Sequence, residues 1–224
     1  MGRLTRIKRF FVRHARQWAV PALLALAITS STWLVFFKDR PPGPGELSNY
    51  LEKSFLIVGA DSVQGHQQVY YIYKDLKVYV TQDEVNHTRP VSSGRYITWL
   101  ERQETGRQII LYDVIEKTRL QLTFDGDNVN QSMSNQNIAW ERVHGGKSLI
   151  YYFNGREVSF ISSAQDSYRP DILNNKIVFT EKISESKWRN TLFAIDDLSL
   201  TTLGEVDKAN SYPKFRNEQI VTGL

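Results

Sequence analysis

The chain has 224 residues, and its 41% hydrophobic and 12% aromatic content is enough for one large packed domain or two small ones. The net charge of +4 is unevenly distributed. Residues 1–40 hold eight basic residues and one acidic residue, so the rest of the chain has 20 basic against 23 acidic residues, a net charge of −3. This mildly acidic body gives no reason to expect nucleic acid as a partner. The absence of cysteine excludes disulfide bonds, a Cys-ligated zinc site and thiol catalysis.

The first predicted element is a transmembrane helix at residues 18–37, where twenty consecutive positions carry no charge. A helix of that length reaches about 30 Å, the thickness of the hydrocarbon core of a bilayer. Six basic residues precede it, so residues 1–17 are expected to be a basic cytoplasmic tail, and everything after Arg40 is expected to be extracytoplasmic. The expected localisation is the cell membrane, with the lipid bilayer as partner of a single-pass anchor. A cleaved signal peptide, with Ala25-Leu26-Ala27 as cleavage site, and a buried globular helix are the alternatives.

Residues 38–46 are expected to form a linker between the membrane and a folded domain. The run "PPGPG", Pro41 to Gly45, has three prolines and two glycines, a composition that favours neither helix nor strand. No helical spacing of useful length follows residue 45, so the domain at 47–224 is expected to be all-β.

A regular repeat runs through residues 47–224. Isoleucine begins a short apolar segment at spacings of 40, 41, 39 and 43 residues, which indicates a repeat architecture. The repeat markers are these isoleucines, the prolines seven residues before them and the aromatic residues two residues after them: Ile57, Ile97, Ile138, Ile177, Ile220, Pro90, Pro170, Pro213, Trp99, Trp140 and Phe179. Gln131 takes the place of the proline in one repeat. A Gly or Asn stands three residues before each isoleucine from Ile97 on, which predicts a tight turn there.

Within each repeat the hydrophobic period is two, and runs rich in β-branched and aromatic residues are separated by polar gaps, which predicts strands. Four antiparallel strands in about 40–45 residues form the blade of a β-propeller. The order Pro, turn, "I-x-W/F", gap, "I-x-x-Y-D", turn, "x-L-T" resembles the TolB-type, WD40-like (PD40) propeller repeat. The resemblance covers about residues 47–224, although the Pro-Asp-Gly turn usual in that family and the Gly-His and Trp-Asp pairs of WD40 repeats are missing. The recurring aromatic residues are expected to fill the space between neighbouring blades.

The repeats are expected at about 47–87, 88–128, 129–168 and 169–208, with a partial fifth at 209–224. Propellers are usually closed rings, in which no sheet edge is left unpaired. One interpretation is that the chain is the front part of a longer protein, which the two strands' worth of pattern in the tail favours. The other is that the last strand completes the first blade, which lacks its own proline-marked strand.

No catalytic, cofactor-binding or metal-binding residue is expected, because the sequence contains no strong motif for such a site. The run "DGDNVN", Asp125 to Asn130, has oxygen ligands at alternate positions but lacks the sixth-place glycine and twelfth-place glutamate of a calcium loop, so a turn is favoured. His66, His87 and His144 are expected to be solvated loop residues. No cofactor is expected.

Recurring charged residues are interpreted as structural. Asp113, like its counterparts at the end of the same strand, is expected to stabilise a hairpin turn. The glutamates that follow the anchor strands, Glu101, Glu141 and Glu181, are expected in ion pairs on exposed edges, with a ring of charge on one propeller face as the alternative.

The expected function is a non-catalytic binding or scaffolding module: a membrane-tethered propeller that presents its loops to a protein, peptide or glycan partner. The alternative is an N-terminal gating or accessory propeller of a larger hydrolase of the prolyl-oligopeptidase or dipeptidyl-peptidase type. A propeller enzyme with acids lining the channel would need convergent carboxylates with shifted pKa values.

Overall fold

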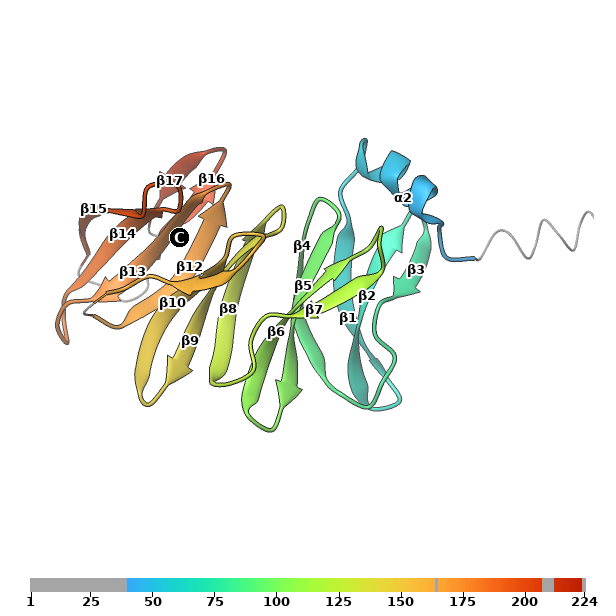
Figure 1. Cartoon of the computed structure of the whole chain (residues 1–224), viewed down its shortest axis with the longest axis horizontal. Helices are drawn as coiled ribbons and strands as arrows, with labels where there is room; N and C mark the ends of the chain where they lie inside the picture. The colour runs from blue at the N-terminus through green and yellow to red at the C-terminus, as the bar shows by residue number, and fades with distance from the viewer. Residues whose placement is uncertain (1–39, 164, 207–211, 223–224) are drawn as a thin grey trace, which may run out of the picture. The chain divides into compact units, whose positions relative to one another are not determined.

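The computed structural model describes residues 40–163, 165–206 and 212–222 (Figure 1). The predicted cytoplasmic tail at 1–17 and the predicted transmembrane helix at 18–37 lie outside these residues, as do residues 38 and 39 of the predicted linker. Within the described ranges, no helix is both long enough and apolar enough to cross a bilayer.

The described chain folds into successive antiparallel sheets, as the two-residue period predicts (Figure 1). Blade 1 has three strands: β1 (Ile57–Val63), β2 (His66–Tyr73) and β3 (Leu76–Tyr79). Blade 2 has four: β4 (His87–Ser93), β5 (Tyr96–Gln103), β6 (Gly106–Asp113) and β7 (Thr118–Gln121). Blade 3 has β8 (Asp127–Ser134), β9 (Asn137–His144), β10 (Lys147–Phe153) and β11 (Val158–Phe160). Blade 4 has β12 (Ser167–Leu173), β13 (Lys176–Lys182), β14 (Trp188–Ala194) and β15 (Ser199–Val206), and blade 5 has only β16 (Lys214–Arg216) and β17 (Gln219–Val221).

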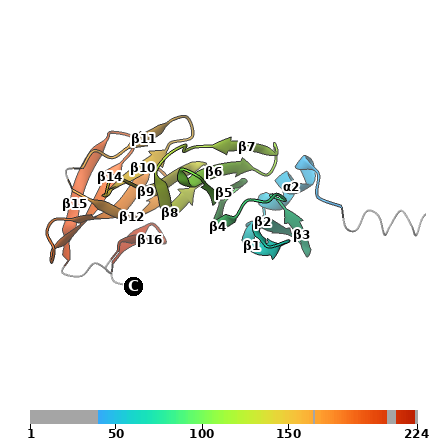
Figure 2. The ribbon, with the colours of Figure 1, turned by 90° about the horizontal axis from the view of Figure 1, so that it is seen from below.

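The strand order fixes the role of each repeat marker. In blades 2 to 4 the strand that holds the proline position pairs with the strand that begins at the isoleucine, so β4, β8 and β12 form one edge of their sheets. We call β4, β8, β12 and β16 the leading strands. Figures 1 and 2 show leading strands of successive blades side by side, with β7 and β11 on the other side of their sheets. This arrangement is consistent with a propeller of several blades.

Among the described residues, blade 1 has no leading strand, and a helix precedes it instead. The helix α2 (Pro44–Leu51) begins inside the segment that was expected to be a linker, so that expectation is wrong from residue 44 on. Pro44 occupies the first helical turn, where its missing N–H costs nothing, and the Glu46 carboxylate accepts the Gly43 N–H at 2.8 Å. Leu47 is fully buried among residues of blades 1 and 2. The proline and glycine therefore start a helix here rather than prevent one.

The recurring aromatic residues lie between blades. Trp99 of blade 2 shares a buried cluster with Val69 and Tyr71 of blade 1. Trp140 of blade 3 lies in a cluster with Leu100 and Ile109 of blade 2, and Phe179 of blade 4 lies with Ile150 and Tyr152 of blade 3. Each ring thus packs against the blade before it. Aromatic side chains dominate core energetics because of the area they bury, which makes these contacts the main apolar links between blades.

Each buried indole finds an acceptor on the leading strand of its own blade. Trp99 donates its Nε1–H to His87 Nδ1 at 3.1 Å, and Trp140 donates to Asn128 Oδ1 at 3.0 Å. Blade 4 has Phe179 at the same position, which needs no acceptor, and Ser167 stands where the acceptor would be. A buried N–H without a partner would be costly. The residue on the leading strand is therefore an acceptor in the two blades whose aromatic residue is tryptophan.

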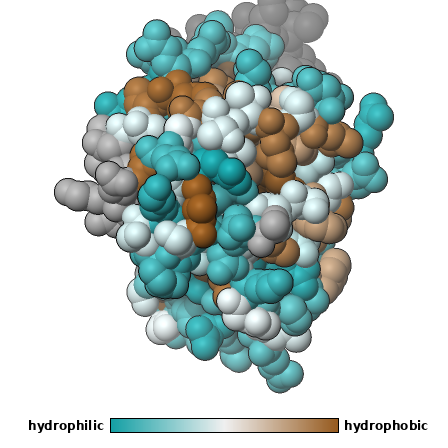
Figure 3. Space-filling view, turned by 90° about the vertical axis from the view of Figure 1, so that its left-hand side faces the viewer, coloured by the Kyte–Doolittle hydropathy of each residue, from teal (hydrophilic) through white to brown (hydrophobic). Residues whose placement is uncertain are grey.

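The first and last blades differ from this pattern. In blade 1 the position of the aromatic residue is Gly59, and a Cβ there would lie 2.4 Å from the hydroxyl oxygen of Tyr70, whose ring occupies the space. Ile57 is 64% exposed, whereas Ile97, Ile138 and Ile177 are fully buried. At the other end, all but one residue of β15 are exposed. Figure 3 shows separate hydrophobic patches among hydrophilic side chains on the side of the molecule that lies at the left of Figure 1. Leu200 and Leu203 of β15 are among the exposed large hydrophobic residues of the domain.

Candidate ligand site on the leading strands

Each complete leading strand contains a β-bulge at the same place. The register between the leading strand and its neighbour shifts between Thr88 and Val91, between Val129 and Ser132, and between Tyr168 and Asp171. The bulge holds one residue in the left-handed region: Arg89 (φ 51°), Asn130 (φ 53°) and Arg169 (φ 48°). This conformation is unfavourable for residues with a side chain, and bulges re-aim side chains. At three equivalent positions, the bulge therefore interrupts the alternation of side chains between the two faces of the strand and changes the direction of a polar side chain.

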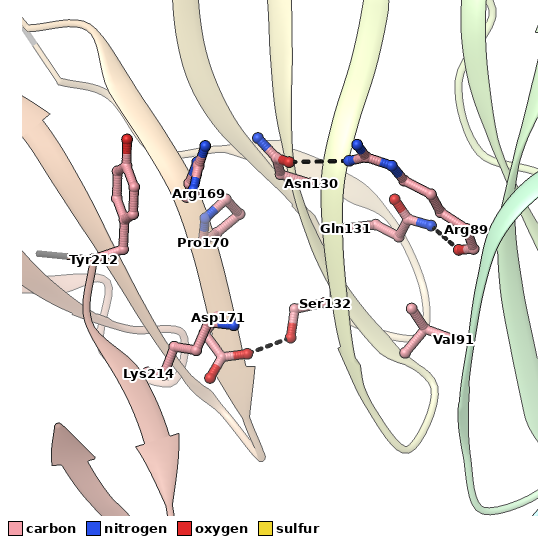
Figure 4. Close-up of a pocket in the computed structure, with 10 residues that line it drawn as sticks. All are labelled: Arg89, Val91, Asn130, Gln131, Ser132, Arg169, Pro170, Asp171, Tyr212 and Lys214. Carbon is pink, nitrogen blue, oxygen red and sulfur yellow. Dashed lines mark hydrogen bonds between the residues drawn. The ribbon is translucent and has the colours of Figure 1, made fainter. Parts of the chain in front are cut away.

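These side chains line a cavity of about 400 Å³ (Figure 4). Its lining comes from the leading strands of blades 2 to 5 and the residues beside them: Arg89, Val91, Asn130, Gln131, Ser132, Arg169, Pro170, Asp171, Tyr212 and Lys214. Figure 4 shows the bulge residues in one row with Tyr212 and a second row formed by Val91, Ser132, Asp171 and Lys214. Four blades thus contribute equivalent positions to a single site.

A hydrogen-bonded network holds the first row. Arg89 Nη1 donates to Asn130 Oδ1 at 3.3 Å, and Asn130 Nδ2 donates to Glu141 Oε2 at 2.8 Å. The same Glu141 oxygen accepts the backbone N–H of Arg169 at 3.1 Å, while Ser148 Oγ donates to its other oxygen at 2.9 Å. Glu141 is buried and has no ion pair among the described residues. Its expected place on an exposed edge is therefore wrong: it supports the row from beneath.

The second row ties blades 3, 4 and 5 together. Ser132 Oγ donates to Asp171 Oδ1 at 2.6 Å, and the backbone N–H of Phe215 donates to Asp171 Oδ2 at 2.8 Å. Asp171 is the only carboxylate among the described residues that line the cavity, and both of its oxygens are thus engaged. The guanidinium of Arg169 lies 4.2 Å from the centre of the Tyr212 ring, a cation–π contact. Within the described ranges, neither Arg89, Arg169 nor Lys214 forms an ion pair with a carboxylate.

The site residues were not predicted, although the repeat register contains their positions. Arg89, Asn130, Arg169 and Tyr212 each stand eight residues before the isoleucine of their repeat, directly before the proline position. Of the predicted markers, Pro170 lines the cavity, Pro90 follows a bulge residue, and Pro213 lies buried just before β16. The aromatic markers lie in the clusters between blades instead.

A second polar cluster lies beneath β4 and corrects two expectations. His87 is 1% exposed and lies within a strand, so it is not a solvated loop residue. Its Nε2 lies 2.8 Å from Asp83 Oδ1, and its Nδ1 lies 3.1 Å from Trp99 Nε1 and 3.3 Å from Glu101 Oε2. The neutral ring accepts the indole N–H at Nδ1, whereas the protonated ring donates to Glu101. Glu101, also buried rather than on an exposed edge, pairs with Arg119.

The pKa values in this cluster shift in opposite directions. Burial alone would raise the pKa of Glu101, but hydrogen bonds from His87 and Gln103 and the charge of Arg119 lower it to about 2. Burial alone would lower the pKa of His87, but Glu101 and Asp83 outweigh it and raise that pKa. In blade 4, Glu181 is likewise buried, and hydrogen bonds from Ser163 and Thr191 and the charge of Arg189 overcome the opposing effect of burial to lower its pKa.

The remaining polar candidates have structural partners. Asp125 pairs with Arg142 at 2.6 Å and Asp127 with Arg107 at 2.5 Å, so these two carboxylates of the calcium-like run face guanidinium groups. Asp113 Oδ1 accepts the backbone N–H groups of Ile115 and Glu116 at 2.9 and 3.2 Å, which confirms its predicted role in a turn.

Comparison with known proteins identifies the fold. No protein-family model and no curated protein matches the chain. A structure described as TolB from Agrobacterium tumefaciens matches with a TM-score of 0.50 and 18% identity, covering 68% of this chain and 62% of that chain. A structure from a study of two prolyl endopeptidases matches with a TM-score of 0.52 and 10% identity, covering 81% of this chain and 34% of that one. Dipeptidyl peptidase 4 from Porphyromonas gingivalis matches with a TM-score of 0.51 and 13% identity, covering 71% of this chain and 32% of that one.

This chain spans less than two thirds of the TolB structure and about a third of each peptidase structure. At identities of 18% or less, these likenesses concern the fold alone. The described domain is a TolB-like β-propeller with several blades.

Proposed function

We propose that the chain is a non-catalytic binding module, a membrane-tethered extracytoplasmic propeller that captures a protein or other ligand at the cavity on its leading strands. The observation that carries this proposal is that equivalent bulge positions of successive blades converge on one cavity, with two arginines and a lysine that lack carboxylate partners in the described part of the chain. Left-handed residues with side chains cluster where a site must be shaped, which supports a ligand role for this row. The tether is the sequence-predicted helix at 18–37.

A second candidate is the gating or accessory propeller of a larger hydrolase. It is favoured by the likeness to two peptidase structures of which this chain covers only about a third. A reading frame that continues beyond Leu224 into a G-x-S-x-G nucleophile motif would favour this candidate over the first. A stop codon there would favour the first.

Site-specific photo-crosslinking tests the binding role. We expect Tyr212→p-benzoylphenylalanine, which keeps an aromatic side chain at the cavity, to give a discrete crosslinked adduct when the full chain is irradiated in the cells that produce it. The matched control is Phe160→p-benzoylphenylalanine, an exposed aromatic position on β11 that is not part of the cavity. Adducts of equal yield from both positions, or none from Tyr212, would contradict capture at the cavity.

Protease treatment of intact cells tests the topology. We expect the domain after Arg40 to be digested from outside, because the basic residues of 1–17 hold the N-terminus in the cytoplasm. A cytoplasmic protein should stay intact in the same sample and an outer-face protein should be cut. If the domain survives while the outer-face protein is cut, the proposed orientation is wrong.

A further inference from the structure

We propose that the cavity on the leading strands binds the carboxylate groups of an acidic peptide segment. This inference rests on the proposed binding role and adds to it the chemistry of the ligand. It depends on three properties of the cavity. Its charge is positive, several of its backbone N–H groups already donate hydrogen bonds within the protein, and its cations come from different blades.

The charge of the cavity is positive in a domain that is otherwise mildly acidic. Among the described residues, Arg89, Arg169 and Lys214 line it, against one carboxylate, Asp171. Asp171 offsets one of these charges, but its two oxygens accept hydrogen bonds from Ser132 and from the backbone of Phe215, and it forms no ion pair with the three cations in the described part of the chain. The charge of the described lining residues therefore stays positive. Five arginines elsewhere in the domain, Arg95, Arg107, Arg119, Arg142 and Arg189, each contact a carboxylate. Arg102, Arg156 and Arg216 show no ion pair among the described residues, but none of these three lines the cavity. The cavity therefore gathers cations whose natural partner is an anion supplied from outside.

The backbone of the cavity is poorly suited to a compact phosphate. Phosphate sites commonly use free backbone N–H groups at a helix N-terminus or in a nest. Three N–H groups at or beside the lining residues are already used: that of Arg169 by Glu141, that of Ile172 by Ser132, and that of Phe215 by Asp171. This favours recognition by side chains. A planar guanidinium fork matches a carboxylate with two parallel hydrogen bonds.

The spacing of the cations fits a chain better than a single ion. Arg89 belongs to blade 2 and Arg169 to blade 4, with the Asn130 amide of blade 3 between them (Figure 4). Lys214 comes from blade 5, and the Tyr212 ring and the Val91 and Pro170 side chains provide apolar surface beside these charges. A peptide with several acidic side chains can meet successive blades at once, and its aliphatic stems can contact the apolar surface.

Both arginines are held in place before a ligand arrives. Arg89 is bonded to Asn130, which Glu141 orients in turn, and Arg169 lies over the Tyr212 ring. Side chains that are already ordered lose less conformational freedom on binding, which favours affinity.

Binding of a defined probe tests this inference. Fluorescein-labelled hexaglutamate and hexaglutamine would be titrated with the purified full chain in nonionic detergent and followed by fluorescence anisotropy. We expect the double variant R89A/R169A to bind hexaglutamate at least about tenfold more weakly than the unsubstituted chain, since each charge-assisted bond is worth more than the free energy of a tenfold change. Because residues 1–17 are basic and also attract acidic peptides, the change between variants is the measured quantity, rather than the affinity itself.

The matched control is R156A, which removes an exposed arginine from the turn after β10, outside the cavity. It should leave hexaglutamate binding within about twofold of the unsubstituted chain, as expected for a screened surface charge. The variants should unfold at the same denaturant concentration, so that a lost fold is not mistaken for a lost site. A variant that keeps the charge but not the fork, R89K/R169K, should bind with intermediate affinity.

Several results would overturn the inference. These are equal loss in R156A and in R89A/R169A, equal binding of hexaglutamate and hexaglutamine, or inorganic phosphate competing as well as glutarate at the same concentration. Crosslinking from Tyr212 that persists undiminished in R89A/R169A would leave the binding role intact and refute only the acidic chemistry. The absence of a crosslinked adduct from position 212 in a chain that carries no other substitution would refute the binding role itself.

Discussion

Trp140→Ala should lower the free energy of unfolding by about 3–5 kcal/mol, the range for removing a large aromatic side chain from a packed core. Trp140 is fully buried between blades 2 and 3, and its removal also leaves Asn128 Oδ1 without the indole N–H that it accepts. Chemical denaturation of the full chain, followed by intrinsic fluorescence or circular dichroism, measures the loss.

The matched control is Phe124→Ala, an aromatic residue that is 70% exposed, which should change the free energy of unfolding by less than about 1 kcal/mol. Trp140→Phe separates the two contributions, because it keeps most of the apolar area and removes only the donor. We expect a cost of about 1–3 kcal/mol for the unpaired acceptor on Asn128. Equal stability of Trp140→Ala and Phe124→Ala would contradict the packing between blades.

Glu101→Gln should destabilise the domain by about 2–3 kcal/mol near pH 6, and this difference should vanish in acid. The pKa of Glu101 is lowered from 4.5 to about 2 in the folded state, so its charge stabilises the fold above the unfolded pKa. That contribution decreases as the pH falls from about 4.5 through about 2, and it is lost only below the folded-state pKa, where the carboxylate is protonated in both states. Denaturant midpoints measured across this range give the profile.

His87 adds a second limb to the same profile. Its pKa is raised above 6.5 in the fold, so the attraction between its imidazolium and Glu101 is fully present below pH 6.5 and is lost as the pH rises through the folded pKa. The advantage of the unsubstituted chain over Glu101→Gln should therefore be largest between about pH 4.5 and 6.5. The matched control is Glu157→Gln, at an exposed glutamate without an ion pair among the described residues, which should change the free energy of unfolding by less than about 1 kcal/mol. A flat profile for Glu101→Gln would refute the coupling.

The strands and their grouping could be predicted from the sequence because the period of the aromatic markers reflects one repeated physical requirement. A ring at the position of Trp99 must be buried against the preceding blade, so the pattern is preserved along the chain. The three-stranded first blade was also foreseeable, because no proline-marked segment precedes Ile57. The helix α2 was missed because proline and glycine were interpreted by composition, whereas their positions at the first turn and the N-cap start a helix.

The candidate site could not be derived from the same pattern. Regular alternation along β4 assigns each side chain to one of two faces, but the bulge at Arg89 adds a residue and interrupts that alternation. The burial of charged residues could not be predicted from the pattern either. Glu141 stands three residues after Ile138, whereas Glu101 and Glu181 stand four residues after Ile97 and Ile177. Regular alternation therefore places Glu141 on the other face of its strand, but only its three-dimensional partners identify it as a support for the cavity. His87 was misassigned because its burial follows from the need of the Trp99 indole for an acceptor.

The packing between blades has a direction, so a deletion from the N-terminal side of the domain does not have the same effect as a deletion from the C-terminal side. Each of Trp99, Trp140 and Phe179 packs against the sheet that precedes its own in the chain. The first sheet has Gly59 at the equivalent position. Removing a sheet from the C-terminal side removes its own ring and exposes the side chains of the preceding sheet that packed against that ring, such as Ile150 and Tyr152. Removing the first sheet from the N-terminal side instead exposes the indole of Trp99. The two series of deletions should therefore expose different surfaces, a large ring on the N-terminal side and the side chains that covered a ring on the C-terminal side.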